Sequence, residues 1–316
     1  MSQKKVIITD FLHPYLAEWL IGRGFHVDIQ PEIRNEALFE IIDQYEGLVL
    51  STKILVTPKL IDKAEKLEFI ARAGSGMENI DVSYAQSKNI IVVNSPEGNA
   101  NAVAEHAVGM LLALMNNIVR ADNQIRNGIW QREENRGEEI EGKTIGIIGY
   151  GHTGSRFAAK WKGFGINILA HDKYKTGFSE AFVKEADVNQ IQQQADILSF
   201  HLPLNQETHH YFNTSFIDGF AKPIWLVNAS RGKIVNTADL ISALDNKKVI
   251  GAALDVFENE KFYELSGSDL ANMQNLTKRH NIILTPHVAG WTHTSHLQLS
   301  KILAEKLDAL GIQSVN

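Results

Sequence analysis

Cysteine is absent from this chain of 316 residues, which excludes disulfides, thiolate metal sites and a cysteine nucleophile. Basic charge is not in excess either. The formal net charge of −6 argues against nucleic acid as the main partner, because a phosphate backbone calls for a basic surface. Long apolar runs are also missing: the N-terminal run is too short for a signal peptide, and the longest apolar helical pattern, Ala102–Met115, contains Glu105 and His106. These absences predict a soluble, cytoplasmic protein that binds neither nucleic acid nor membrane.

Short apolar runs alternate with helical stretches along the chain, which is typical of parallel β-α-β units. The first series of predicted strands comprises Val6–Thr9, His26–Ile29, Gly47–Leu50, Leu67–Ala71 and Ile90–Val93. The second series comprises Thr144–Ile148, Ile166–His171, Asp196–His201, Ile224–Asn228, Ile250–Asp255 and Ile282–Thr285. A helical pattern at Ala102–Arg126, followed by a charged stretch to Lys143, separates the series and predicts a surface connection between domains. The fold class is therefore expected to be α/β, with two doubly wound parallel sheets.

Two overlapping phosphate-binding patterns lie between Gly137 and Gly154. GEEIEGKT (137–144) fits the nucleoside-triphosphate loop, and GYGHTG (149–154) fits the dinucleotide turn. A triphosphate loop must follow a buried strand and open a helix. GEEIEGKT instead follows polar residues, contains three glutamates that would repel phosphates, and leads into a strand. The first pattern is therefore interpreted as a chance match.

GYGHTG has the context that dinucleotide binding requires, with the strand TIGII before it and the helical SRFAAKWKGFG after it. Its first glycine allows a tight turn, the second lets a pyrophosphate approach the backbone, and the third lets the helix pack on the strand. The next predicted strand ends at Asp172, whose carboxylate suits the adenosine ribose hydroxyls and favours NAD, while Lys173 keeps NADP open. Cofactor contacts are predicted from Gly149, Tyr150, Gly151, His152, Thr153, Gly154, Asp172 and Lys173.

Charged side chains follow several strands of the second series, at the carboxyl ends where open α/β sheets bind their ligands. These residues are Arg231, Asp255, Glu258, Glu260 and His287. Hydride transfer on a 2-hydroxy acid needs a histidine that moves the hydroxyl proton, a carboxylate that orients the histidine, and an arginine that polarises the carbonyl. The sequence therefore predicts such a reaction beside the nicotinamide, with Asp255 also at the cofactor. No metal site is predicted, because the closely spaced histidines elsewhere have no carboxylate in the same segment.

Seven stretches, in the same order, resemble the D-isomer-specific 2-hydroxyacid dehydrogenase family over nearly the whole chain. They are RAGSGMENIDV (72–82), NSPEGNANAVAEHAVGMLL (94–112), GKTIGIIGYGHTG (142–154), HLPLNQETHHYFN (201–213), VNASRGKIVN (227–236), AALDVFENE (252–260) and TPHVAGWT (285–292). The first two are most similar to those of phosphoglycerate dehydrogenases. Two departures stand out. Lys261 follows Glu260 where the family has proline, which leaves Glu258 as an alternative, and Leu50 replaces an arginine, which leaves Lys53 or Arg72 to bind a phosphate.

The resemblance implies functional residues at the matching positions. Arg231, Glu260 and His287 are the implied catalytic residues, with His287 as acid/base and Glu260 as its partner. Further cofactor contacts are implied for His201, Leu202, Pro203, Thr208, Asn228, Ala229, Ser230 and Gly290. The substrate carboxylate is expected at backbone N–H groups near Ser75 and Gly76, in a substrate site with Ser51, Lys53, Arg72 and Gly74.

The resemblance also implies a flavodoxin-like substrate domain, residues 1–98 plus 290–316, into which a Rossmann NAD domain, residues 99–289, is inserted. The expected activity is NAD-dependent hydride transfer between a D-2-hydroxy acid and its 2-keto acid. D-3-phosphoglycerate, a precursor in serine biosynthesis, is the first expected substrate, and another small 2-hydroxy acid is the alternative. A non-enzymatic NAD(H)-sensing corepressor on the same fold is the alternative from another class. A homodimer is expected, with the 102–126 helix and the following arm at its interface, although packing within the chain explains the apolar face of that helix equally well.

Overall fold

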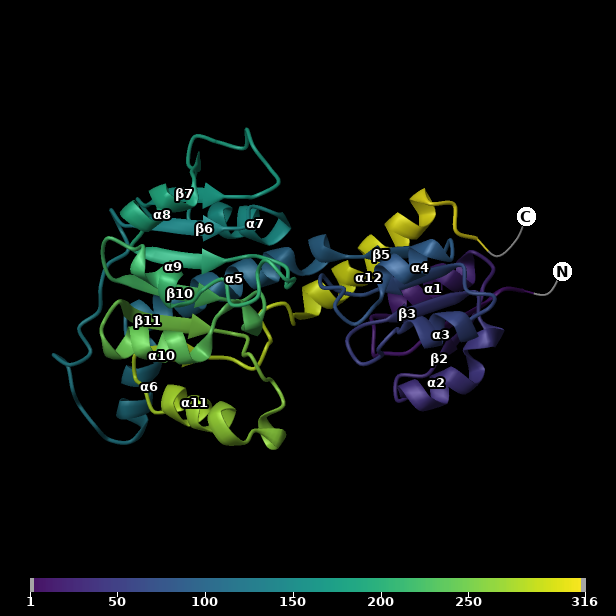
Figure 1. Cartoon of the computed structure of the whole chain (residues 1–316), viewed down its shortest axis with the longest axis horizontal. Coiled ribbons are helices and arrows are strands. Elements are labelled where there is room, and N and C mark those ends of the chain that lie inside the picture. The colour runs from purple at the N-terminus through teal and green to yellow at the C-terminus, as the bar shows by residue number, and fades with distance from the viewer. Residues whose placement is uncertain (1–2, 314–316) are drawn as a thin grey trace. The chain divides into compact units, whose positions relative to one another are not determined.

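The computed structural model describes residues 3–313 and divides into two compact α/β units (Figure 1). The first unit is Met1–Ala100 with Trp291–Asn316, and the second is Asn101–Gly290. These bounds lie within a few residues of the predicted ones. The charged stretch that precedes Lys143 belongs to the second unit and does not connect the two, contrary to expectation.

The first unit is built on a sheet of five parallel strands in the order β2-β1-β3-β4-β5, which is the flavodoxin-like order. Its elements are β1 (Lys5–Ile8), α1 (Pro14–Gly22), β2 (His26–Ile29), α2 (Asn35–Ile41), η1 (Ile42–Gln44), β3 (Gly47–Leu50), α3 (Pro58–Lys63), β4 (Phe69–Arg72), α4 (Val82–Ser87), β5 (Ile91–Asn94) and α12 (His293–Ala309).

Both faces of this first sheet are covered, because its strands alternate apolar side chains between the two faces. Ile7, Leu48 and Ile70 pack with the helices α2, α3 and α4 on one face. On the other face, Val49 and Ala71 pack with α1 and with a leucine stripe of α12. Helix α12 therefore belongs to the first unit, although almost two hundred residues of chain separate it from β5.

The second unit contains seven parallel strands in the order β12-β11-β10-β9-β6-β7-β8. Numbered from β6, this is the Rossmann order extended by one strand, with its switch point between β6 and β9. Its elements are α5 (Pro96–Met115, which begins before the boundary), α6 (Ile118–Arg126), β6 (Thr144–Ile148), α7 (His152–Lys160), β7 (Asn167–His171), β8 (Lys184–Glu185), α8 (Val188–Gln194), β9 (Ile197–Phe200), α9 (Thr214–Asp218), β10 (Ile224–Asn228), η2 (Gly232–Ile234), α10 (Thr237–Asp245), β11 (Val249–Leu254), η3 (Phe262–Glu264), α11 (Gly267–Thr277) and β12 (Ile282–Leu284).

The second sheet is also covered on both faces, as Figure 1 shows. Helices α8, α9 and α10 pack on one face around Leu198 and Leu226. Helices α5 and α7 pack on the other face around Ile147 and Val227. With both faces covered, a sheet of this kind binds its ligands at the carboxyl ends of its strands, which all lie at the same edge.

Two local features differ from the sequence prediction. The single helix expected over 102–126 is two helices, because Asn117 adopts a left-handed conformation with φ of 53° and bends the chain by 65°. Strand β8 was not predicted, since it has only two residues, both charged, and carries no apolar pattern. Within residues 3–313, no single helix is long and apolar enough to cross a membrane. Only α5 and α6 taken together have the length and composition of a membrane-spanning segment, and a bend of 65° separates them.

Candidate active site

The glycine turn between β6 and α7 leaves open space where a dinucleotide pyrophosphate would approach. Gly149 has a φ of 95°, and a Cβ on it would lie 2.4 Å from the His201 carbonyl oxygen. A Cβ on Gly154 would lie 2.0 Å from the carbonyl oxygen of Gly149. Around Gly151, by contrast, nothing among the described residues lies within 4 Å of such a Cβ. Two glycines are thus required by close packing, while the third faces open space at the N-terminus of α7, as NAD binding needs.

Asp172, at the end of β7, is fixed directly against this turn. Its Oδ2 accepts a hydrogen bond from the Tyr150 N–H at 2.9 Å, and its Oδ1 accepts from the N–H groups of Tyr174 and Lys175 at 2.9 and 3.1 Å. The carboxylate is therefore held in one orientation beside the glycine turn. One lone pair on Oδ2 stays available for a ribose hydroxyl, which fits the predicted contact.

Three predicted catalytic side chains follow β10, β11 and β12. His287 Nδ1 lies 2.8 Å from Glu260 Oε2. Partial burial raises the pKa of Glu260, but the hydrogen bond with the His287 imidazole, the charge of that ring, the Phe257 N–H and the nearby Arg231 guanidinium outweigh it, so that this pKa lies below its usual value. Arg231 is brought close by Gly232, on which a Cβ would lie 1.8 Å from the Phe257 carbonyl oxygen. The turns after β10 and β11 are thus in direct contact.

The pairing with Glu260 leaves the other ring nitrogen of His287 open. A carboxylate at Nδ1 selects the tautomer with hydrogen on that atom, which makes Nε2 a base in the neutral ring. Within residues 3–313, no hydrogen bond reaches Nε2. The arrangement is suited to taking a proton from a ligand and returning it.

Asp255 holds the loop that carries His287. This residue is fully buried, and its carboxylate accepts hydrogen bonds from Thr285 Oγ1 at 2.5 Å and from the N–H groups of Val288 and Ala289 at 2.9 and 2.8 Å. Its carbonyl oxygen accepts from the His287 N–H at 2.8 Å. These bonds fix His287 in a left-handed conformation with φ of 55°. Asp255 therefore has a structural role in the site. Its contact with the cofactor stays a prediction.

Four other residues predicted at the cofactor direct their side chains into the protein. The Tyr150 ring stacks on Phe178, the His201 ring packs on Phe157, Thr208 donates to the Pro203 carbonyl, and Asn228 donates to the Arg231 carbonyl. Each of these side chains thus has a partner within the protein, and the contacts of these four residues with the cofactor stay predictions. The other residues predicted at the cofactor lie in the segments that follow β6, β9, β10 and β12, at the same carboxyl edge of the sheet. They are His152, Thr153, Leu202, Pro203, Ala229, Ser230 and Gly290.

The carboxyl edge of the first unit contains the predicted substrate residues. Arg72 is buried behind the following loop, and a Cβ on Gly74 would lie 1.9 Å from its Nη1. Ser75 donates its hydroxyl to Asn99 Oδ1 at 2.8 Å, yet no hydrogen bond within the described part of the chain uses the backbone N–H of Ser75 or Gly76. The N–H of Ser51 is already bound to Asp10 Oδ2 at 2.8 Å.

Lys53 is exposed but held in place. Its ammonium donates to the Thr9 carbonyl at 2.6 Å and also to the Pro31 carbonyl. An ammonium has three donors, so one remains for a ligand. The structure thus separates the two predicted phosphate-binding cations: Arg72 lies inside the unit and Lys53 faces solvent at its edge.

His106 is a site residue that the sequence did not reveal. Its Nε2 lies 3.0 Å from Thr285 Oγ1, the same hydroxyl that donates to Asp255. The only sequence feature that marks His106 is its place within the apolar pattern of α5. That feature does not show that Thr285, far away in the chain, is its partner.

The fold and this site together define a dinucleotide-binding α/β protein with a paired histidine and carboxylate at the cofactor edge. Residues 108–289, more than half of the chain, match the family model described as D-isomer specific 2-hydroxyacid dehydrogenase, NAD binding domain. The protein belongs to this family, and its second unit contains the family's NAD-binding domain.

Similar proteins include members with different substrates. The chain is 32% identical over 306 residues to D-3-phosphoglycerate dehydrogenase of Archaeoglobus fulgidus, covering 96% of this chain and 56% of that protein. It is 31% identical over 313 residues to hydroxypyruvate reductase of Thermotoga maritima, covering 99% of this chain and 100% of that protein. Among solved structures, D-lactate dehydrogenase of Aquifex aeolicus, complexed with NAD and lactic acid, matches with a TM-score of 0.83 at 25% identity, covering 98% of this chain and 95% of that one. The chain spans about half the length of the phosphoglycerate dehydrogenases it matches.

Proposed function

We propose that this protein is an NAD-dependent oxidoreductase that transfers hydride between a D-2-hydroxy acid and its 2-keto acid. The observation that carries the proposal is the pair of His287 and Glu260, with Nε2 of the histidine open, on the sheet edge that also carries the glycine turn. Bound NAD supplies the hydride acceptor or donor in this chemistry. The protein supplies the proton and the orientation.

His287 is the proton carrier. In the oxidation, the hydroxyl proton of the substrate passes to Nε2 while the hydrogen on C2 leaves as hydride; in the reduction, Nε2 returns the proton to the forming alkoxide. Glu260 stabilises the imidazolium that forms, because its lowered pKa keeps it ionised. Arg231 offers donors in a planar fork, which suit the carbonyl oxygen and the carboxylate of a 2-keto acid.

The substrate carboxylate is proposed to bind at Ser75 and Gly76 in the first unit. Their two N–H groups are consecutive and are not used by the described part of the chain, as an anion-binding backbone segment requires. The first unit would thus contribute neutral backbone donors to the carboxylate.

Phosphohydroxypyruvate and 3-phosphoglycerate are the first substrate pair to test, and their use would place the reaction in serine biosynthesis. Lys53 supports this pair, because its ammonium is exposed, fixed by two carbonyls and left with one donor. Hydroxypyruvate, which has no phosphate, is the second candidate. Leu50 stands where the phosphoglycerate dehydrogenases that the chain resembles have an arginine, so one cation for a phosphate is missing. Lys53→Gln should raise the KM for phosphohydroxypyruvate about tenfold and leave the KM for hydroxypyruvate unchanged, as expected for one lost charge-assisted hydrogen bond.

Nicotinamide absorbance tests the proposed activity. Purified protein with NADH is offered phosphohydroxypyruvate, hydroxypyruvate, glyoxylate and pyruvate, and NADH binding is measured separately by fluorescence. Oxidation of NADH by at least one of these acids is expected. Tight NADH binding without oxidation by any of them would contradict the proposed activity and favour the cofactor-sensing alternative.

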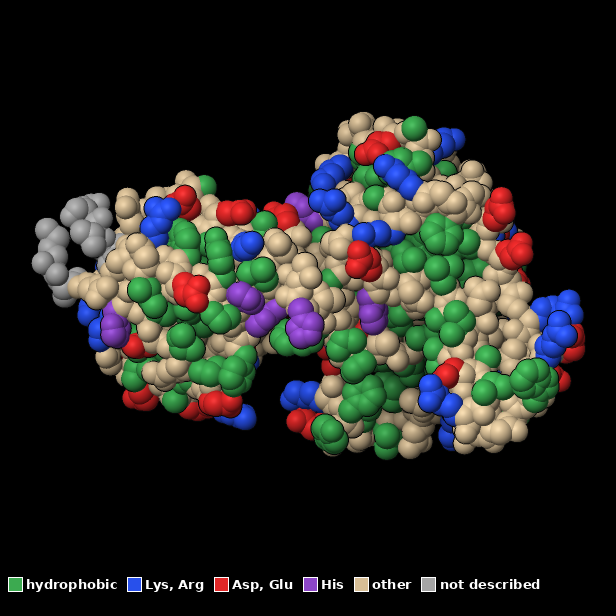
Figure 2. All heavy atoms as spheres, turned by 180° about the vertical axis from the view of Figure 1, so that it is seen from behind, with side chains coloured by type: hydrophobic (Ala, Val, Ile, Leu, Met, Phe, Trp, Pro, Cys, Tyr) green, Lys and Arg blue, Asp and Glu red, His purple; other side chains and the backbone are tan. Residues whose placement is uncertain are grey.

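A cytoplasmic homodimer is proposed as the working form. The apolar side chains of α5, including Met110 and Leu111, are buried within the chain, so they do not form the interface. Helix α6 and the following arm instead expose large apolar side chains, at Ile118, Val119, Ile125, Ile129 and Trp130. Figure 2 shows hydrophobic side chains exposed over this face of the second unit. Sedimentation velocity should show a dimer that Trp130→Glu converts to monomer; a wild-type monomer would contradict the proposal.

A further inference from the structure

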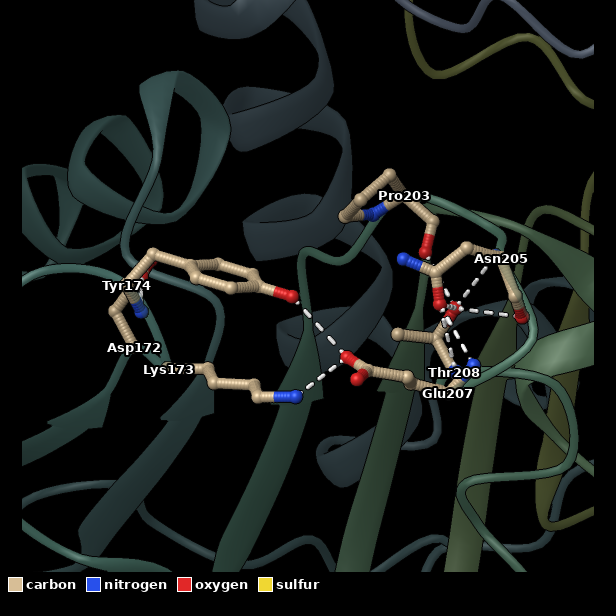
Figure 3. A network of polar contacts seen from close by, with 7 residues as sticks. All are labelled: Asp172, Lys173, Tyr174, Pro203, Asn205, Glu207 and Thr208. Carbon is tan, nitrogen blue, oxygen red and sulfur yellow. Dashed lines mark hydrogen bonds and ion pairs between the residues drawn. The ribbon is translucent and has the colours of Figure 1, made fainter.

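An exposed ion pair connects the loops that follow β7 and β9. Lys173 Nζ lies 2.6 Å from Glu207 Oε2, and the Tyr174 hydroxyl donates to the same oxygen at 3.1 Å (Figure 3). In the sheet, β7 and β9 are the two neighbours of β6. The contact therefore passes across the end of β6, which is where the glycine turn begins and where Asp172 is held.

Glu207 is presented by a closed turn. The Asn205 side chain accepts hydrogen bonds from the Glu207 N–H at 2.9 Å and from the Thr208 N–H at 3.0 Å. The buried Thr208 hydroxyl donates to the Pro203 carbonyl at 2.7 Å and accepts from the Asn205 N–H at 2.8 Å. Figure 3 shows these bonds gathered around the Thr208 hydroxyl. The backbone at Glu207 is thus fixed, and its carboxylate reaches toward Lys173 from a defined position.

Lys173 is the cation that would otherwise attract a 2′-phosphate. It directly follows Asp172, and an NADP molecule would place its 2′-phosphate beside that carboxylate. Glu207 engages the ammonium of Lys173 and raises its pKa, so the lysine stays charged but is paired. Lys175, whose Nζ lies 3.4 Å from the Tyr150 carbonyl oxygen, is a second cation at this end of the turn, and it is not paired with Glu207. The pairing with Glu207 therefore occupies Lys173 alone.

We infer that Glu207 is a specificity-determining residue for NAD, because it withholds Lys173 from the 2′-phosphate of NADP. Asp172 alone repels that phosphate but leaves a neighbouring lysine to compensate. The pairing with Glu207 removes the compensation that Lys173 would supply. A 2′-hydroxyl is unaffected, since Asp172 accepts its hydrogen bond and needs no cation. This inference rests on the proposed use of NAD and is independent of the 2-keto acid that the enzyme reduces.

The test compares dissociation constants of NADH and NADPH, measured by nicotinamide fluorescence without any substrate. Glu207→Gln keeps the size of the side chain and removes its charge. NADPH should bind up to about fivefold more tightly to this variant, as expected for one exposed charge pair, while the NADH constant stays unchanged. The gain should diminish at high salt, because both charges are exposed.

Two further variants make the outcome decisive. Adding Lys173→Gln to Glu207→Gln should abolish the gain in NADPH affinity. Glu138→Gln is the control, since Glu138 is a glutamate of similar exposure that pairs with Lys143 at 2.9 Å, away from the glycine turn, and it should leave both constants unchanged. An unchanged NADPH constant in Glu207→Gln, a gain that survives loss of Lys173, or an equal gain in Glu138→Gln would each overturn the inference. Loss of NADH binding by the wild-type protein would instead overturn the proposed function.

Discussion

The second unit contains two histidine–glutamate pairs that look alike in chemistry and in backbone. His210 Nε2 lies 2.5 Å from Glu258 Oε1, and His287 Nδ1 lies 2.8 Å from Glu260 Oε2. Both histidines have a positive φ, of 51° and 55°. The two glutamates are separated by a single residue, so sequence alone left either one open as the catalytic partner.

The surroundings of the two pairs differ. In the first pair, Glu258 Oε2 also accepts from the Thr237 N–H at 2.7 Å, at the start of α10, and the other ring nitrogen of His210 faces the Asn236 amide at 3.5 Å. Both ring nitrogens and both carboxylate oxygens of that pair therefore have a partner, and the pair ties α10 to the turn after β11. In the second pair, one ring nitrogen of His287 has no hydrogen bond in residues 3–313, and Arg231 adds a cation nearby. Both pairs join an imidazole to a carboxylate, so the open ring nitrogen of His287 is what singles it out as the proposed proton carrier.

The largest expected effect is on the two histidines. Asparagine tolerates a positive φ, so His287→Asn and His210→Asn preserve the backbone while removing each imidazole. His287→Asn should lower kcat by about 10³-fold, within the range for loss of a general acid–base group. His210→Asn should change kcat by less than about threefold and lower only stability. Steady-state kinetics on both variants measure the difference; equal losses of activity would erase the distinction drawn between the pairs.

The two glutamates should separate activity from stability in the same way. Glu260→Gln should lower kcat by about 10- to 100-fold, because the imidazolium loses its counter-charge while the base remains. Glu258→Gln should keep kcat but reduce the free energy of unfolding by about 1 kcal/mol, since the contacts with His210 and Thr237 are weakened. Urea unfolding and initial rates on both variants provide the measurement. A larger loss of activity in Glu258→Gln would make Glu258 the catalytic partner.

A third histidine, His201, has no carboxylate partner. It is expected to make the stability of the protein depend on pH. Burial lowers the pKa of His201 from 6.5 to about 3. Between these values the unfolded chain binds a proton at this residue and the folded chain does not, so stability falls as the pH decreases, by up to about 1.4 kcal/mol per pH unit. Above pH 6.5 the contribution disappears.

Replacing His201 by glutamine should remove this dependence. The amide can keep the contact that His201 Nε2 makes with Ser199 Oγ at 2.9 Å. The free energy of unfolding of His201→Gln should then decline less steeply than that of the wild type between pH 6 and pH 4, by about 1 kcal/mol per pH unit. Parallel curves for wild type and His201→Gln would show that this ring is not held neutral.

Much of this architecture follows from sequence pattern, and the exceptions have physical causes. The strands of both sheets were predicted because continuous apolar runs are typical of strands buried on both faces, whereas β8 has two charged residues and no such run. The residues at the strand ends were predicted because parallel strands bring their carboxyl ends together. Side-chain direction was not predictable: nothing in the sequence shows that Asp255 is buried and holds the loop of His287, or that Glu207 meets Lys173 across the end of β6. Such contacts depend on loop geometry, for which pattern and propensity carry no signal.

The most direct test of the central claim is a single-turnover measurement of hydride transfer with NADH already bound. Mixing this complex rapidly with the best 2-keto acid isolates the chemical step from binding and product release. The wild type should oxidise its bound NADH in one fast phase, and His287→Asn should do so about 10³-fold more slowly with NADH affinity unchanged. A hydride-transfer phase of wild-type rate in His287→Asn would contradict the assignment of this imidazole as the proton carrier.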